Sequence, residues 1–258
     1  MSQRNRDGKR SARERLRERQ EQDRARRKRN RTLAVLGVVV GVLAVAAGVG
    51  VLAASGGGDD DSGGPVTAPR GATGKDDLVI AAGSASARST LAVYEDFRCP
   101  ACKQFEDSFR TTVHQLQKKG RLRTEYHLVT LIDGNLGGSG SLKAANAAAC
   151  AQDSGHFAAY HDVLFRNQPQ ESDDAFGDND RLIELAGRVR GLDTADFRAC
   201  VRDGRHDGWV RASHRAFSDA GYGSTPTVLL DGKNVYADRS DPLTPGKLKK
   251  RVNAAAKG

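Results

Sequence analysis

The sequence predicts an α/β fold with an inserted helical block, preceded by one transmembrane helix and a flexible linker. Three observations lead to this prediction. An uncharged apolar run lies near the N-terminus, and strand-like runs flank a helix within residues 77–132. Strand-like runs then return only after residue 220, whereas between about 140 and 220 the apolar residues recur at helical spacing.

The net charge of +9 belongs to the N-terminal tail. Of the 41 basic and 32 acidic residues, 14 and 5 lie in residues 1–31, so that 27 of each remain. The pI of about 9.6 therefore describes the tail and gives no support to a nucleic-acid partner for the rest of the chain. We predict a basic cytoplasmic tail over residues 1–31.

A transmembrane anchor is predicted over residues 32–54. Residues 33–54 carry no charge, and a helix of that length spans about 33 Å, enough to cross a hydrocarbon core of about 30 Å. The basic tail before this run and three aspartates at 59–61 after it place the N-terminus in the cytoplasm. A cleaved secretory signal is the alternative, and the run is longer than most signal cores.

Either interpretation sends the C-terminal part of the chain across the cell membrane, into a compartment where disulfides persist. Residues 55–76 are rich in Gly, Ser, Asp and Pro and lack apolar periodicity, which predicts a flexible linker. Residues 77–258 are then expected to form an extracytoplasmic folded domain on a single-pass membrane protein.

The folded domain opens with a predicted β–β–α–β order. Residues 78–80 and 90–97 are strand candidates, a helix runs from the cysteine pair to about residue 118, and a further strand covers 126–131. A helix that joins two strands in this way is typical of a parallel crossover.

The helical block at about 140–220 follows, and within it Thr194 is a candidate N-cap. Strand character returns at residues 227–230, and the Asp231-Gly232 pair predicts a hairpin to residues 234–236. Thr244 followed by proline fits the cap and first position of a final helix.

The chemistry of the domain is predicted to lie at Cys99 and Cys102. A Cys-x-x-Cys pair at a strand-to-helix junction is a redox signature. Unpaired N–H groups at the helix N-terminus favour a thiolate at Cys99, and Pro100 suits the first helical turn. Cys102 shares the apolar stripe of the helix. We therefore predict an exposed nucleophile at Cys99 and a buried resolving thiol at Cys102.

Other interpretations of this pair are weaker. A zinc site requires further ligands at suitable spacing, and the other cysteines and the six histidines show none. Haem attachment requires histidine after the second cysteine, where the chain has Lys103. A purely structural disulfide would close a ring too small to stabilise the fold much. We expect neither a metal nor a cofactor.

Residues 94–102 read Tyr-Glu-Asp-Phe-Arg-Cys-Pro-Ala-Cys and resemble the active-site segment of DsbA-like thioredoxin-fold proteins. Residues 223–227, Gly-Ser-Thr-Pro-Thr, resemble the cis-proline loop of that family, and the helical block resembles its insert. The resemblance implies a thioredoxin-like fold and thiol–disulfide oxidoreductase activity. It also implies that Pro226 is cis beside the cysteine pair and that the backbone of Thr225 pairs with a substrate peptide.

The chain departs from the family pattern at two places. The dipeptide between the cysteines is Pro100-Ala101, without the histidine of the strongest oxidants, which favours a less oxidising potential. The acidic residue that many relatives have six positions before the first cysteine is replaced by Val93. Glu95 and Asp96 lie closer to the motif, where we expect either a proton relay for the resolving thiol or a simple solvated acidic pair.

Cys150 and Cys200 both lie in the predicted helical block. If the redox pair is Cys99 and Cys102, these two can form a structural disulfide that clamps the insert; two free buried thiols are the alternative.

The resulting hypothesis is an enzyme that oxidises dithiols of exported proteins through the Cys99–Cys102 disulfide. The resemblance implies reoxidation by a quinone-linked membrane partner of the DsbB or vitamin K epoxide reductase type. One rival hypothesis is a reductase or isomerase fed with electrons. Another is a tethered peptide-binding module without enzymatic activity.

Overall fold

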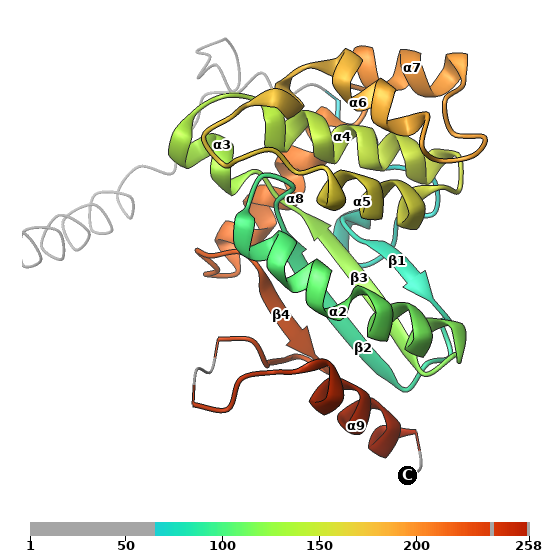
Figure 1. Cartoon of the computed structure of the whole chain (residues 1–258), viewed down its shortest axis with the longest axis vertical. Helices are drawn as coiled ribbons and strands as arrows, with labels where there is room; N and C mark the ends of the chain where they lie inside the picture. The colour runs from blue at the N-terminus through green and yellow to red at the C-terminus, as the bar shows by residue number, and fades with distance from the viewer. Residues whose placement is uncertain (1–64, 238–239, 257–258) are drawn as a thin grey trace, which may run out of the picture. The chain divides into compact units, whose positions relative to one another are not determined.

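The structure is a computed structural model and describes residues 65–237 and 240–256 (Figure 1). The predicted tail, the predicted anchor and most of the predicted linker lie outside the described residues. Within the described part of the chain, no helix combines the length and the apolar character needed to cross a membrane.

A five-stranded mixed sheet forms the base of the domain. Its order is β1-β3-β2-β4-β5, with β2 and β3 parallel, β1 antiparallel to β3, and β4 antiparallel to β2. The strands are β1 (Ile80–Gly83), β2 (Ser89–Glu95), β3 (Leu122–Leu128), β4 (Thr227–Leu230) and β5 (Lys233–Asn234). Burial alternates along β2 and β3, so that each presents one face to the core.

Helices α2 (Pro100–Lys118) and α9 (Pro245–Ala255) complete the α/β part. In the chain, α2 connects β2 to β3. Figure 1 shows that it lies across one face of the sheet. Its apolar stripe, which includes Phe105, Phe109 and Val113, joins strand residues and α9 in one buried cluster. This packing fixes the start of α2 at the end of β2, where the cysteine pair lies.

The predicted helical block is present and packs at one end of the sheet (Figure 1). Its central helix α4 is rich in alanine and buried along most of its length, because the other helices of the block surround it. The helices are α3 (Leu131–Leu136), α4 (Gly140–Asp153), α5 (Phe157–Arg166), α6 (Asn179–Ala186), α7 (Ala195–Arg202) and α8 (Asp207–Asp219). A disulfide between Cys150 of α4 and Cys200 of α7 closes the block, which is the predicted pairing.

Local signals in the sequence behave as expected. The side chain of Thr194 accepts a hydrogen bond from Phe197 N, and that of Thr244 accepts one from Lys247 N. In the β4–β5 hairpin, Asp231 and Gly232 have φ of 51° and 80°, the left-handed conformation that a type I′ turn requires.

Several predicted strand boundaries are wrong. The strand predicted over residues 126–131 ends at Leu128, and α3 begins at Leu131. The buried carboxylate of Asp96 accepts a hydrogen bond from Ile132 N at 2.8 Å, so a contact from the turn after β2 helps to begin the helix. The first strand begins at Ile80 instead of residue 78.

Ordered contacts also extend N-terminal to the predicted domain boundary at residue 77. His206 Nδ1 donates to Thr67 O at 2.8 Å, and Arg70 N donates to Asp153 Oδ1 at 2.7 Å. Residues 67–76, predicted as linker, therefore lie against the helical block. Their partners come more than 80 residues later in the chain, which is why composition alone indicated a linker.

Candidate active site

Cys99 is the N-cap of α2, at the end of the turn that leaves β2. The carbonyl of Cys99 accepts the hydrogen bond of Lys103 N at 3.2 Å, which opens the helix. Pro100 occupies the first helical position, where its missing N–H costs nothing, and both Pro100 and Ala101 are exposed. The sequence predicted this placement.

The loop before β4 faces the first cysteine. The Thr225–Pro226 peptide bond is cis, as the resemblance implied, and Cys99 Sγ lies 3.4 Å from Thr225 O. A hydrogen bond from the Cys102 thiol lowers the pKa of Cys99 to about 6 against the opposing effect of burial. The Thr225 side chain and the backbone N–H groups of Ala101 and Cys102 add to the lowering.

Cys102 has the opposite electrostatics. Its side chain is fully buried, and burial raises its pKa well above the ordinary value for a thiol, with the hydrogen bond and charge of Cys99 adding to the effect. Neither cysteine is in a disulfide, so this geometry is that of the dithiol. One thiol is therefore prepared as an anion and its neighbour is held as a neutral thiol.

The predicted exposure of Cys99 is wrong in degree, because only 6% of the residue is exposed, against 0% for Cys102. The Thr225–Pro226 loop lies on one side of it. On the insert side, Gln168 Nε2 donates to Phe97 O and to Cys99 O, each at 2.9 Å. The sequence could not show this cover, since Gln168 lies 69 residues after Cys99.

Glu95 and Asp96 do not form the solvated acidic pair considered as one possibility. Both are buried, with 1% and 0% of each residue exposed. Asp96 accepts hydrogen bonds from Arg98 N and Ile132 N, both at 2.8 Å, and burial raises its pKa to about 7. Asp96 thus shapes the turn that carries Cys99.

Glu95 lies closer to the chemistry of the resolving thiol. Its charge contributes to the raised pKa of Cys102. Its Oε1 atom is 2.7 Å from His161 Nε2 of α5, and both side chains are buried. Glu95 therefore contacts the helical insert and contributes to the electrostatics of the resolving thiol.

Sequence reasoning missed Glu106 and Arg98. Glu106 is buried on α2, one turn after Cys102, and burial raises its pKa to about 7. A charged residue inside the apolar stripe of a helix was the available signal. Arg98 is 2% exposed, and its Nη1 atom lies 2.7 Å from Asp133 and 2.9 Å from Asp174. No local pattern marks an arginine beside a turn as buried.

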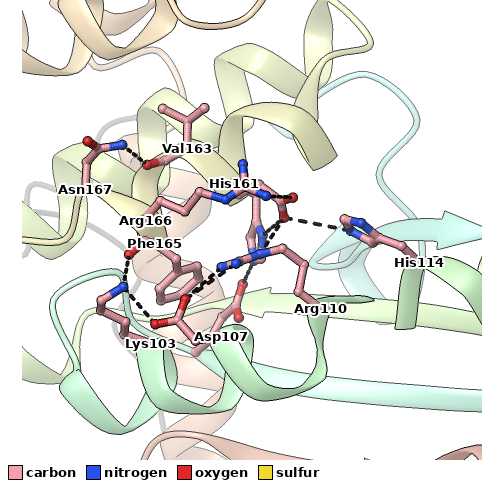
Figure 2. A network of polar contacts seen from close by, with 11 residues as sticks. Lys103, Asp107, Arg110, His114, His161, Val163, Phe165, Arg166 and Asn167 are labelled. Atoms are coloured by element: carbon pink, nitrogen blue, oxygen red, sulfur yellow. Dashed lines mark hydrogen bonds and ion pairs between the residues drawn. The ribbon is translucent and has the colours of Figure 1, made fainter. Parts of the chain in front are cut away.

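A polar network joins α2 to α5 beside these residues (Figure 2). Arg110 and His114 of α2 reach toward Asp162 of α5, with nitrogen–oxygen distances of 3.2 and 3.8 Å. Lys103 Nζ donates to Phe165 O at 3.0 Å. The redox helix is thus held to the insert at three positions between Lys103 and His114.

Two groups of potential metal ligands occur among the described residues. In the first, Cys150 and Cys200 stand beside His206, but both sulfur atoms are committed to the disulfide. In the second, the ligand atoms of Glu95, Glu106 and His161 lie within 4.8 Å of one another. The short Glu95–His161 contact accounts for this second group as an ion pair, and we assign no metal to it.

Known proteins of the thioredoxin fold are similar to this chain. A family model described as thioredoxin matches residues 75–254. The chain is similar to the reduced form of a disulfide bond oxidoreductase, DsbG, from Mycobacterium tuberculosis, at 28% identity with a TM-score of 0.60, over 70% of this chain and 88% of that one. It is also similar to oxidised DsbA of the same organism, at 27% identity with a TM-score of 0.59, over 70% and 93% of the two chains.

MdbA, a thiol-disulfide oxidoreductase from Actinomyces oris, shares the fold at 22% identity with a TM-score of 0.57, over 69% of this chain and 85% of that one. Among curated proteins, the chain is 25% identical over 168 residues to the serine/threonine-protein kinase PknE of Mycobacterium tuberculosis. That match covers 62% of this chain and 29% of the kinase, so the chain spans less than a third of the length of this relative.

Proposed function

We propose that this chain, which belongs to the thioredoxin family, oxidises dithiols of exported proteins through Cys99 and Cys102. The proposal starts from its class, a thiol–disulfide oxidoreductase of the DsbA type. The observation that carries the proposal is the contrast between the two thiols. Cys99, at the start of α2 and beside the cis Pro226 loop, has its pKa lowered to about 6, whereas that of Cys102 is raised.

The proposed cycle begins with the Cys99–Cys102 disulfide. A substrate thiolate attacks Cys99 Sγ, the bond to Cys102 breaks, and Cys102 leaves with the electron pair and takes up a proton. A second substrate thiolate then attacks the substrate sulfur of the mixed disulfide and displaces Cys99 as a thiolate. The substrate has lost two electrons to form its disulfide, and the cysteine pair has gained them.

The low pKa of Cys99 supports the oxidising direction. A stabilised thiolate is a good leaving group, and it favours the reduced enzyme over the disulfide, which makes that disulfide a stronger oxidant. Thr225 O, 3.4 Å from Cys99 Sγ, is the backbone group that we expect to pair with an extended substrate segment.

The exported location of the substrates rests on the N-terminal sequence. The basic residues 1–31 and the uncharged residues 33–54 favour a single-pass membrane protein with its domain outside the cytoplasm. For turnover, the reduced Cys99–Cys102 pair must pass its electrons to an oxidant, and we propose a quinone-linked membrane oxidase of the DsbB or vitamin K epoxide reductase type.

The test is the reduction potential of the Cys99–Cys102 pair, measured by equilibration with glutathione, together with refolding of reduced ribonuclease by the full chain. We expect a potential well above the thioredoxin value of about −270 mV and refolding that is lost in Cys99→Ser. A potential near that of thioredoxin would favour the reductase or isomerase hypothesis. Equal refolding by the full chain and by Cys99→Ser would favour the peptide-binding module.

A further inference from the structure

A histidine of the helical insert lies against the buried acids of the redox helix. His161 of α5 is 1% exposed, and its Nε2 atom is 2.7 Å from Glu95 Oε1. The ligand atoms of His161, Glu95 and Glu106 all lie within 4.8 Å of one another. Three elements, β2, α2 and α5, thus bring two carboxyl groups and one imidazole together without solvent exposure.

Aromatic side chains surround His161. Four aromatic rings, of Phe97, Tyr126, Phe157 and Phe165, have centroids between 4.9 and 5.7 Å from its own. Such rings exclude water and accommodate a cation on their faces. Burial opposes charge on the imidazole, yet the Glu95 carboxylate and hydrogen bonds to Asp162 and Glu95 outweigh it and raise the pKa of His161 to about 10.

The charged and titratable groups that face this cluster come from every element packed around it. They are Glu95 of β2, Glu106, Arg110 and His114 of α2, Tyr126 of β3, and Asp162 and Arg166 of α5. Within this cluster, Glu106 is the group that gains or loses its proton near neutral pH. Burial raises its pKa to about 7, and the charge of His161 restrains that rise.

The cluster acts on the resolving thiol. Glu106 lies one helical turn after Cys102 on the same buried side of α2, and the charge of Glu95 raises the pKa of Cys102. The Oε2 atom of Glu95 is buried and has no hydrogen-bond partner among the described residues. A buried carboxylate oxygen of the cluster is therefore available to accept a proton.

We propose that His161, supplied by the helical insert, is the positioning residue that holds Glu95 and Glu106 in their charged form beside Cys102, so that the insert governs proton exchange of the buried thiol. This rests on the proposed redox function of the cysteine pair. When Cys102 attacks a mixed disulfide at Cys99, its proton passes to the carboxyl pair, the Cys99–Cys102 bond forms, and the departing thiolate takes the electron pair. In the oxidising direction the same proton returns to Cys102.

The experiment follows the resolving step in the full chain. Cys99 is converted to a mixed disulfide with 5-thio-2-nitrobenzoate, and release of the coloured thiolate by Cys102 is timed from pH 5 to 9. In the wild type we expect the rate to rise with a midpoint near pH 7. In His161→Gln the midpoint is expected to move up by about one pH unit, which slows release at pH 7 about fivefold.

His127→Gln is the matched control. His127 is a half-buried histidine of β3 that stacks on Tyr94 with centroids 4.0 Å apart, and burial lowers its pKa to about 4, so it is neutral at pH 7. Its profile is expected to coincide with that of the wild type. Glu106→Gln provides the second variant, and it should reduce the inflection near neutrality to the part that comes from Asp96, whose pKa burial also raises to about 7.

Each outcome has one meaning. A His161→Gln profile that coincides with the wild type overturns the inference. If His161→Gln does not fold, the inference is overturned by a Glu106→Gln profile that coincides with that of the wild type. Failure of the wild type itself to release the coloured thiolate would overturn the proposed function, and the two failures are therefore distinct.

Discussion

At the scale of single residues, the site depends on two thiols three positions apart that have opposite proton affinities. The first stands at the start of α2, among N–H donors, and the second lies inside the core. The hydrogen bond between them is the largest influence on Cys99, so each cysteine sets the chemistry of the other. The turn before Cys99 is held by buried polar contacts, since Asp96 and Arg98 are both buried and both bind residues of the insert side.

The reactivity of Cys99 should follow its lowered pKa. We expect alkylation of the reduced chain by iodoacetamide to have a midpoint near pH 6, so that about 90% of Cys99 is thiolate at pH 7. In Cys102→Ala the midpoint should move upward, because the thiol that donates to Cys99 is gone. A wild-type midpoint near pH 9 would contradict this expectation.

At the scale of secondary-structure elements, the insert contributes directly to the redox centre. Gln168 binds the carbonyls of Phe97 and Cys99, and α5 places His161 against Glu95. Both cysteines of the pair belong to the buried cluster that the insert builds. We therefore expect the position of the insert to affect the reactivity of the cysteine pair as well as the stability of the fold.

The Cys150–Cys200 disulfide should stabilise this element. It joins α4 to α7 across a sequence separation of 50 residues, for which the chain-entropy model gives about 4 kcal/mol. We expect Cys150→Ala/Cys200→Ala to lower the free energy of unfolding by about that amount, measured by urea denaturation without reductant. The control is Cys99→Ala/Cys102→Ala, which removes a much smaller ring. Equal effects of the two double variants would argue against a structural role for the Cys150–Cys200 bond.

The elements differ in how far the sequence predicts them. Local chemistry sufficed for the helix caps at Thr194 and Thr244 and for the Asp231-Gly232 turn, because cap and turn each involve residues at most three positions apart. The same holds for the start of α2 at Cys99. The burial of Glu95 depends on His161, 66 residues away, and no pattern around residue 95 shows it. The burial of a residue could not be predicted where its contact partner is distant in the sequence.

At the scale of the whole molecule, the buried charges make stability depend on pH. The pKa of His161 is raised to about 10 from an ordinary value of about 6.5. Its contribution to stability is fully present below about pH 6.5, because there both states bind the proton, and it is lost as the pH rises through about 10. Burial raises the pKa of Asp96 and Glu106 to about 7, so these groups also lower stability as the pH rises from about 4, and their effect is complete by about pH 8.

We therefore expect the free energy of unfolding of the oxidised protein to fall between pH 7 and 10. Oxidised protein is used because Cys99 and Cys102 do not titrate in a disulfide. Replacement of His161 by Gln should flatten the dependence, as measured by urea denaturation at fixed ionic strength. A wild-type stability that is constant over this range would show that the imidazole is not charged in the folded state.

The attachment of residues 67–77 to the helical block has a mechanical consequence. Besides the bonds at Thr67 and Arg70, Trp209 Nε1 donates to Asp77 O at 2.7 Å. A pulling force applied at residue 65 meets these bonds before it reaches β1. We therefore expect such a force to pass to α4 and α8 before it reaches the strand and turn that present the cysteine pair.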